Sequence, residues 1–99
     1  MNKTNPITEE YLKTAGYKRD MSAPAGVHRM YNETKGYKNH FSWVTFQNGC
    51  AVAAFIRVNH YNADGALCNT GVWQKEGDRL TVGDLAAGIE KTGADITLA

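Results

Sequence analysis

Hydrophobic side chains are densest between His40 and Val58, in the stretch HFSWVTFQNGCAVAAFIRV. Two runs rich in aromatic and β-branched residues flank Asn48-Gly49 within this stretch. The dipeptide suits a type I′ turn, because both of its positions need positive φ angles. The pattern therefore predicts a β-hairpin with its turn at residues 48–49.

The short turn also predicts the register of the hairpin, with Gln47 opposite Cys50 and Trp43 opposite Ala54. One face then carries Phe41, Trp43, Thr45, Cys50, Val52, Ala54, Ile56 and Val58. The other face carries His40, Ser42, Val44, Phe46, Ala51, Ala53, Phe55 and Arg57. Both faces are largely apolar, whereas antiparallel strands commonly show one face to water. The pattern therefore raises the question of whether the chain itself covers the second face.

Two helices are expected at the ends of the chain. Thr8 and Thr81 are suitable N-caps, because a threonine hydroxyl can accept from a free N–H of the first turn. Gly93 suits the left-handed residue that ends a helix. The apolar spacing predicts one helix within residues 6–16 and a second that starts at Thr81.

Further strands are predicted at residues 27–32 and 70–75, on either side of the hairpin. Glycine, proline and polar residues predict loops in three places, namely 18–26, 33–39 and 59–67. The predicted class is α+β, with an antiparallel sheet of about four strands and an N-terminal and a C-terminal helix. The order of elements is α-β-β-β-β-α.

The position of the helices decides whether the second face is buried or exposed. They can cover one face each, or both can pack on the Trp43 face. In the second case an apolar patch stays exposed, formed by Val44, Phe46, Ala51, Ala53 and Phe55. An exposed patch of this kind marks a surface for a partner or for a second copy of the chain.

Composition adds limits to this picture. The chain has 99 residues, of which 42% are hydrophobic and 21% charged. This length predicts a single α+β domain over residues 1–99. The net charge is +1, yet residues 1–60 carry eight basic and four acidic side chains. Such a basic half is either an ordinary solvated surface or a contact for nucleic acid or an acidic protein.

The N-terminal sequence MNKTNPITEEYL lacks the apolar core of a signal peptide. No apolar run in the sequence approaches the roughly 20 residues that span a membrane. We therefore expect a cytoplasmic protein, in which Cys50 and Cys68 stay reduced.

The sequence holds no recognisable catalytic or metal-binding motif. Its three histidines and two cysteines lack the spacing of zinc ligands. It contains neither a glycine-rich phosphate loop nor a nucleophile elbow. No cofactor or metal is therefore expected. An enzyme would need a pocket that brings a histidine and a thiol or carboxylate within hydrogen-bond reach.

Aromatic and basic residues offer two binding functions on the same surface. Interface centres in proteins use exposed aromatics and arginine, which predicts a protein partner or a homodimer. Single-stranded nucleic acid is the alternative, since bases stack on aromatic side chains and phosphates contact cations. The candidate partner-binding residues are Tyr37, His40, Val44, Phe46, Phe55, Arg57, His60 and Tyr61.

The two ends of the chain carry a resemblance to a type of protein. ITEEYLKTAGYKR, from Ile7 to Arg19, and TVGDLAAGIEKTG, residues 81–93, flank short aromatic strands. This arrangement resembles small accessory proteins carried by phages and mobile elements. The resemblance implies a cytosolic role in which the chain binds a host protein directly and inhibits or redirects it. A component of a host defence system would be one such target.

Overall fold

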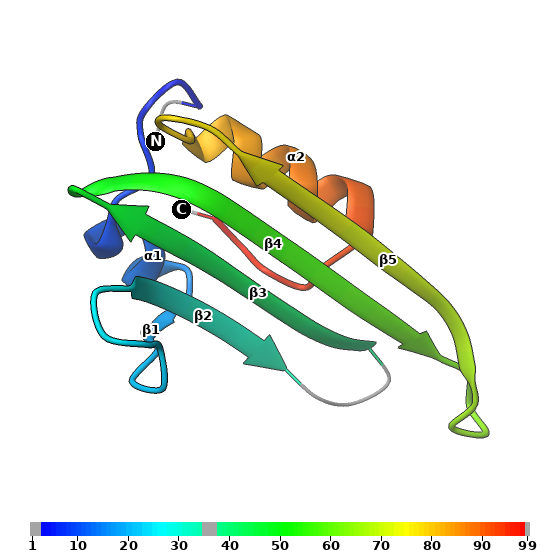
Figure 1. The fold of residues 1–99 in the computed structure, drawn as a ribbon. Helices are drawn as coiled ribbons and strands as arrows, with labels where there is room; N and C mark the ends of the chain where they lie inside the picture. The colour runs from blue at the N-terminus through cyan, green and yellow to red at the C-terminus, as the bar shows by residue number, and fades with distance from the viewer. Residues whose placement is uncertain (1–2, 35–37, 99) are drawn as a thin grey trace.

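Over the residues that the structure describes, five antiparallel strands lie side by side in chain order in one sheet (Figure 1). This computed structural model describes residues 3–34 and 38–98. The strands are β1 Lys18–Arg19, β2 His28–Thr34, β3 Lys38–Gln47, β4 Cys50–Tyr61 and β5 Leu67–Glu76. Helix α1, Glu9–Thr14, precedes the sheet, and helix α2, Val82–Thr92, follows it. The predicted α+β class is therefore confirmed, with the two-residue strand β1 added to the expected sheet.

Both helices begin at the predicted threonine caps. The Thr8 hydroxyl accepts a hydrogen bond from the Tyr11 N–H at 3.1 Å. The Thr81 hydroxyl accepts from the Asp84 N–H at 3.3 Å, and the Asp84 carboxylate accepts from the Thr81 N–H at 2.8 Å. Gly93 ends α2 with a φ of 72°. Neither helix in the described part of the chain is long and apolar enough to span a membrane.

The hairpin turn lies where the sequence predicts it, but the register beyond it differs. Asn48 and Gly49 have φ angles of 52° and 78°, as a type I′ turn requires. Trp43 lies opposite Phe55, however, and not opposite Ala54. The predicted register is therefore wrong by one residue over most of the hairpin.

A β-bulge near the turn causes this difference. Phe46 pairs with Ala51, whereas Thr45 pairs with Ala53, so that Val52 is the extra residue. The carbonyls of Ala51 and Val52 both bond to the segment before α2. They accept from the Leu80 N–H at 2.8 Å and from the Gly77 N–H at 3.0 Å. These bonds hold the bulge in place.

The bulge exchanges the two predicted faces along β4. Ala54, Ile56 and Val58 share a face with Val44, and Phe55 lies on the opposite face. A sheet face defined by simple alternation from the turn therefore mixes residues from the two sides.

One side of the sheet, which we call the packed face, is covered by both helices and by residues 94–98. These segments lie behind the strands in Figure 1. Tyr17, which follows α1, joins its hydroxyl to the buried Ser42 hydroxyl of β3 at 2.6 Å. The core beneath contains Ile7, Leu12, Tyr17, Met30, Val44, Phe46, Ala51, Ala54, Ile56, Val58, Leu80, Leu85, Ala94 and Ile96.

Both helices thus pack on one face, but it is the Val44 face and not the Trp43 face. The patch predicted to stay open loses Val44, Phe46 and Ala51 to the core, where they are 0%, 7% and 0% exposed. The helices cover this face because the bulge places Ala54, Ile56 and Val58 on the same side of the sheet as Val44.

Two glycines let α2 approach the sheet closely. A Cβ atom on Gly88 of α2 would lie 2.4 Å from ring carbons of Trp73 in β5. A Cβ atom on Gly71 of β5 would lie 3.3 Å from the backbone of Thr92. Helix and strand therefore touch through glycine at two points along α2.

Candidate binding face

The side of the sheet opposite the helices, which we call the bare face, has no cover among the described residues. Neither α1, α2 nor residues 94–98 lie on it (Figure 1). Strand pairing arranges its side chains in rows that cross β2, β3, β4 and β5. The rows are Glu33-Phe41-Arg57-Val72, Tyr31-Trp43-Phe55-Gln74 and Arg29-Thr45-Ala53-Glu76.

Aromatic side chains occupy the middle of the bare face. The rings of Trp43 and Phe55 stack, with centroids 5.6 Å apart and planes at 15°. Tyr31 lies opposite Trp43 on the next strand, and Phe41 is two residues from Trp43 on the same side of β3. All four side chains are half-buried. The face therefore has an aromatic centre that extends over three adjacent strands.

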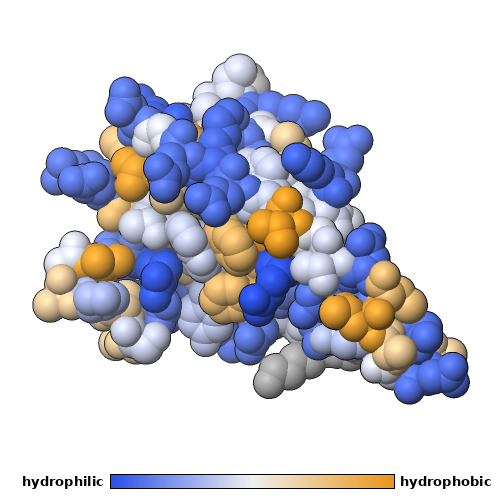
Figure 2. Space-filling model, turned by 45° about the vertical axis from the view of Figure 1, so that its right-hand side comes forward, coloured by the Kyte–Doolittle hydropathy of each residue, from blue (hydrophilic) through white to orange (hydrophobic). Residues whose placement is uncertain are grey.

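Charged and polar residues surround this centre. Arg57 is exposed beside Phe41, and Val72 next to it is 51% exposed. Figure 2 shows apolar residues interrupted by polar ones over the visible surface. Arg29 donates from Nε to the Asp20 carboxylate at 2.9 Å. Hydrogen bonds from Ser22, together with this contact, hold the pKa of Asp20 below its usual range.

The structure separates the predicted partner-binding residues into two groups. Phe55 and Arg57 lie on the bare face. His40, Val44 and Phe46 lie on the packed face and are 3%, 0% and 7% exposed. These three were expected on an open surface with Phe55, which is wrong because the bulge places them on the side that the helices cover.

The remaining predicted residues lie away from the aromatic centre. His60 approaches the C-terminal end of α2, with its Nε2 atom 3.4 Å from the Thr92 carbonyl oxygen. Tyr61 is half-buried at the end of β4, opposite Leu67, where the pairing with β5 shifts. Tyr37 lies outside the described residues.

Sequence reasoning missed Trp43 and Phe41 as members of the candidate face. Alternation alone put both on the side expected to receive the helices. The missing signal was the bulge at Val52, which reverses the relation between β3 and β4. Without it, Trp43 and Phe55 cannot be placed side by side.

A separate hollow of about 560 Å³ opens near the hairpin turn. His28 of β2 lies at its wall, with Nε2 2.5 Å from a carboxylate oxygen of Glu9 in α1. Nδ1 of the same ring lies 2.8 Å from Nη2 of Arg19 in β1. The hollow thus brings a histidine and a carboxylate within hydrogen-bond reach, as the enzyme alternative requires.

The bonding of His28 argues against a catalytic base. A guanidinium group only donates, so Nδ1 accepts from Arg19 and the Nε2–H donates to Glu9. Both ring nitrogens are therefore occupied, and neither is available to take a proton from a substrate. The ring also packs edge-on against Phe46, with centroids 5.9 Å apart. The contacts connect α1, β1 and β2, which is a structural role.

Cys50 is a half-buried and Cys68 an exposed free thiol. Over the residues that the structure describes, no three His, Cys, Asp or Glu side chains gather as metal ligands would. Comparisons with protein-family models, with curated proteins and with solved structures give no match. The uncovered aromatic centre of the bare face is therefore the main indication of function.

Proposed function

We propose that the chain is a non-enzymatic binding module that docks a protein partner on the bare face. The row Tyr31-Trp43-Phe55, left uncovered on the sheet, carries this proposal. Aromatic side chains concentrate binding energy at the centre of protein interfaces, because they bury a large area at a low entropic cost. Arg57 beside them is the other residue type enriched at such centres.

A protein partner fits the bare face better than single-stranded nucleic acid does. The stacking of Trp43 on Phe55 already uses one side of each ring, so fewer ring faces remain for bases. The charges of the three rows are balanced, with Arg29 and Arg57 against Glu33 and Glu76. Phosphate binding draws instead on an excess of positive charge.

The partner proposed from the resemblance is a host protein. Ile7–Arg19 and residues 81–93 resemble the ends of small phage and mobile-element accessory proteins. Such a protein acts in the host cytoplasm by direct binding, which inhibits or redirects its target. A protein of a host defence system is a target of this type. The bare face would be the contact surface.

A pair of charge variants tests the proposal. Phe55→Glu places a carboxylate in the aromatic centre, whereas Thr97→Glu adds the same charge at an exposed position of the C-terminal tail. Wild type and Thr97→Glu should retain the same protein from a host lysate, and Phe55→Glu should lose it while staying folded by circular dichroism. Equal retention by all three chains would overturn the proposal.

Nucleic acid is tested in the same experiment series by fluorescence anisotropy with mixed-sequence single-stranded DNA and RNA. The proposal expects no binding at low salt. Micromolar binding that falls steeply with added salt, and that Phe55→Glu removes, would assign the face to nucleic acid instead.

A further inference from the structure

The two edges of the sheet differ in how they are protected. One edge is strand β1, only two residues long and made of Lys18 and Arg19. Short edge strands and basic side chains are devices that prevent another chain from pairing there. The other edge is β5, with ten residues. No described strand pairs with its outer side (Figure 1).

Most of strand β5 lacks the charged side chains and prolines that usually protect an edge. Its segment LCNTGVWQ, residues 67–74, contains no charged residue and no proline. Leu67 and Val72 are 56% and 51% exposed. An exposed edge that is long, uncharged and partly apolar is a template for a further strand.

The outward hydrogen-bonding groups of β5 follow from one bond. The Gly77 N–H donates to the Val52 carbonyl of β4 at 3.0 Å. In an antiparallel pair, alternate residues direct their N–H and C=O groups toward and away from the neighbour. Glu76, Gln74 and Val72 therefore direct both groups outward, as does Thr70. An extended backbone is the ligand that satisfies this row.

We propose that β5 pairs antiparallel with β5 of a second copy, giving a two-fold symmetric dimer with one continuous sheet. The charge pattern of the strand favours an identical partner in this direction. Lys75 and Glu76 lie at one end, so an antiparallel pair centred near Trp73 sets them against the uncharged Gly71 and Thr70. Parallel pairing in register would set lysine against lysine and glutamate against glutamate.

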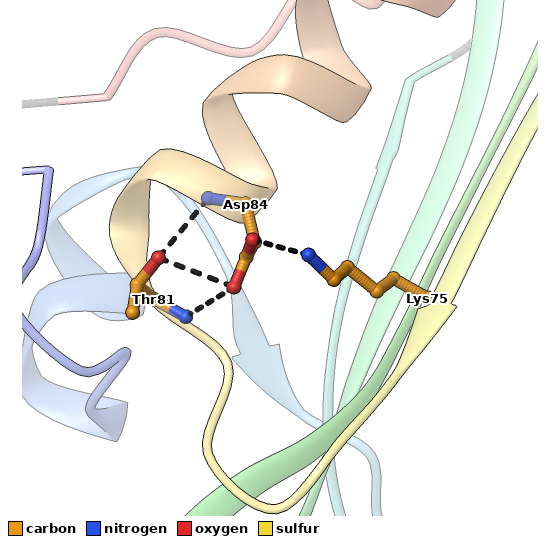
Figure 3. A network of polar contacts seen from close by, with 3 residues as sticks. All are labelled: Lys75, Thr81 and Asp84. Atoms are coloured by element: carbon orange, nitrogen blue, oxygen red, sulfur yellow. Dashed lines mark hydrogen bonds and ion pairs between the residues drawn. The ribbon is translucent and has the colours of Figure 1, made fainter.

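Helix α2 supports the same symmetry. Asp84 lies on the β5 side of α2, since its carboxylate accepts from Lys75 Nζ at 2.6 Å (Figure 3). Helical spacing places Ala87 and Lys91 on that flank too. Ala86 and Ile89 lie on the other flank, against the tail. A two-fold axis beside β5 brings the two copies of α2 together in antiparallel directions. The small Ala87 side chains then lie between the helices, and Asp84 of one copy faces Lys91 of the other.

This dimer is independent of the proposed function, because β5 contacts its copy through its edge and not through the bare face. A two-fold axis perpendicular to the sheet keeps both bare faces on one side. The two aromatic centres then form one wider docking surface.

Sedimentation velocity over a wide range of concentration tests the dimer. Wild type should reach twice the 10.9 kDa of one chain and dissociate on dilution. Val72→Pro removes an outward N–H from each copy without touching the β4 ladder, and should raise the dimer Kd at least about tenfold. Phe55→Glu alters only the bare face and should leave the dimer intact. A monomer at every concentration would overturn the proposal.

A second pair of variants tests the dimer if Val72→Pro fails to fold. Lys91→Glu removes the charge expected to face Asp84 and should weaken the dimer, whereas Glu90→Lys, one residue away, should not. Equal effects would overturn the proposal. Amide exchange at Val72 and Gln74 gives a further check, because it should slow as the protein concentration rises. If it slows only when an extended peptide is added, the proposal is overturned.

Discussion

Phe55 and Ile56 are neighbours in β4, yet they belong to faces with different roles. Ile56 is 0% exposed in the core between the sheet and its cover. Phe55 is half-buried and has the Trp43 ring stacked on it, with no helix above. Both residues are strongly apolar, so hydrophobicity does not distinguish them. What lies above each face decides whether an apolar side chain stabilises the fold or is available to a partner.

The largest expected contrast comes from placing the same charge on each face. Ile56→Glu buries a carboxylate without a partner, which costs several kcal/mol and should remove most of the stability of an ordinary domain, about 5–15 kcal/mol. Phe55→Glu removes the stacked pair, which is worth about 0.5–1.5 kcal/mol, and the partial burial of the ring, and should cost less than Ile56→Glu. Urea unfolding followed by circular dichroism measures both.

Phe55→Leu is the control for this pair, because it loses the stacking but keeps an apolar side chain. It should be as stable as Phe55→Glu or slightly more so. If Phe55→Glu unfolds as Ile56→Glu does, the bare face is part of the core, and the proposed docking surface loses its basis.

The sequence was informative about where elements start and stop. Thr8, Thr81 and Gly93 mark helix ends through local hydrogen bonds and backbone angles, which do not depend on the rest of the fold. Asn48-Gly49 marks the turn for the same reason. These signals were sufficient for the α+β class and for the order of most elements.

The faces could not be predicted in the same way. Residues 51–54 are Ala-Val-Ala-Ala, so no polar side chain shows which one is skipped by the bulge. The bulge depends on backbone bonds from Gly77 and Leu80, far along the chain. Strand β1 lies in a segment that the sequence predicts to be a loop, because two residues give no periodic pattern. The predicted binding residues are partly wrong for the same reason, because the register decides which residues share a face.

A second test concerns the packed face alone. Burial raises the pKa of Tyr17 from 10.0 to about 12, and the hydrogen bond with Ser42 offsets part of this effect. The unfolded chain thus loses its Tyr17 proton near pH 10, whereas the folded chain keeps it to about pH 12. Stability from this group is fully present below pH 10 and falls as the pH rises toward 12, by about 3 kcal/mol.

Urea unfolding at several values between pH 9 and 12 measures this loss as a falling midpoint. Tyr17→Phe cannot ionise at this position, so its stability should decline less over the same range. At neutral pH it should be about 1 kcal/mol less stable than wild type, because the buried Ser42 hydroxyl loses its partner. Parallel declines for the two chains would show that Tyr17 is not held neutral by the fold.

A third test, whose expected effect is smaller than the pH effect of Tyr17, concerns how tightly the cover fits the packed face. In Gly88→Ala the new methyl group meets the Trp73 ring at 2.4 Å, so the ring or α2 must move. Overpacking of this kind costs about 1–3 kcal/mol, and the better helix propensity of alanine returns up to about 1 kcal/mol. A net loss of about 1–2 kcal/mol is expected in urea unfolding.

Gly71→Ala is the matched control on the strand side of the same contact. Its methyl group would meet the Thr92 backbone at 3.3 Å, which a shift of a few tenths of an ångström relieves. Its loss should therefore be smaller than that of Gly88→Ala. If Gly88→Ala were as stable as wild type, Trp73 would be free to turn away at no cost. Helix α2 would then pack only loosely on β5. The packed face would differ less from the bare face than the structure indicates.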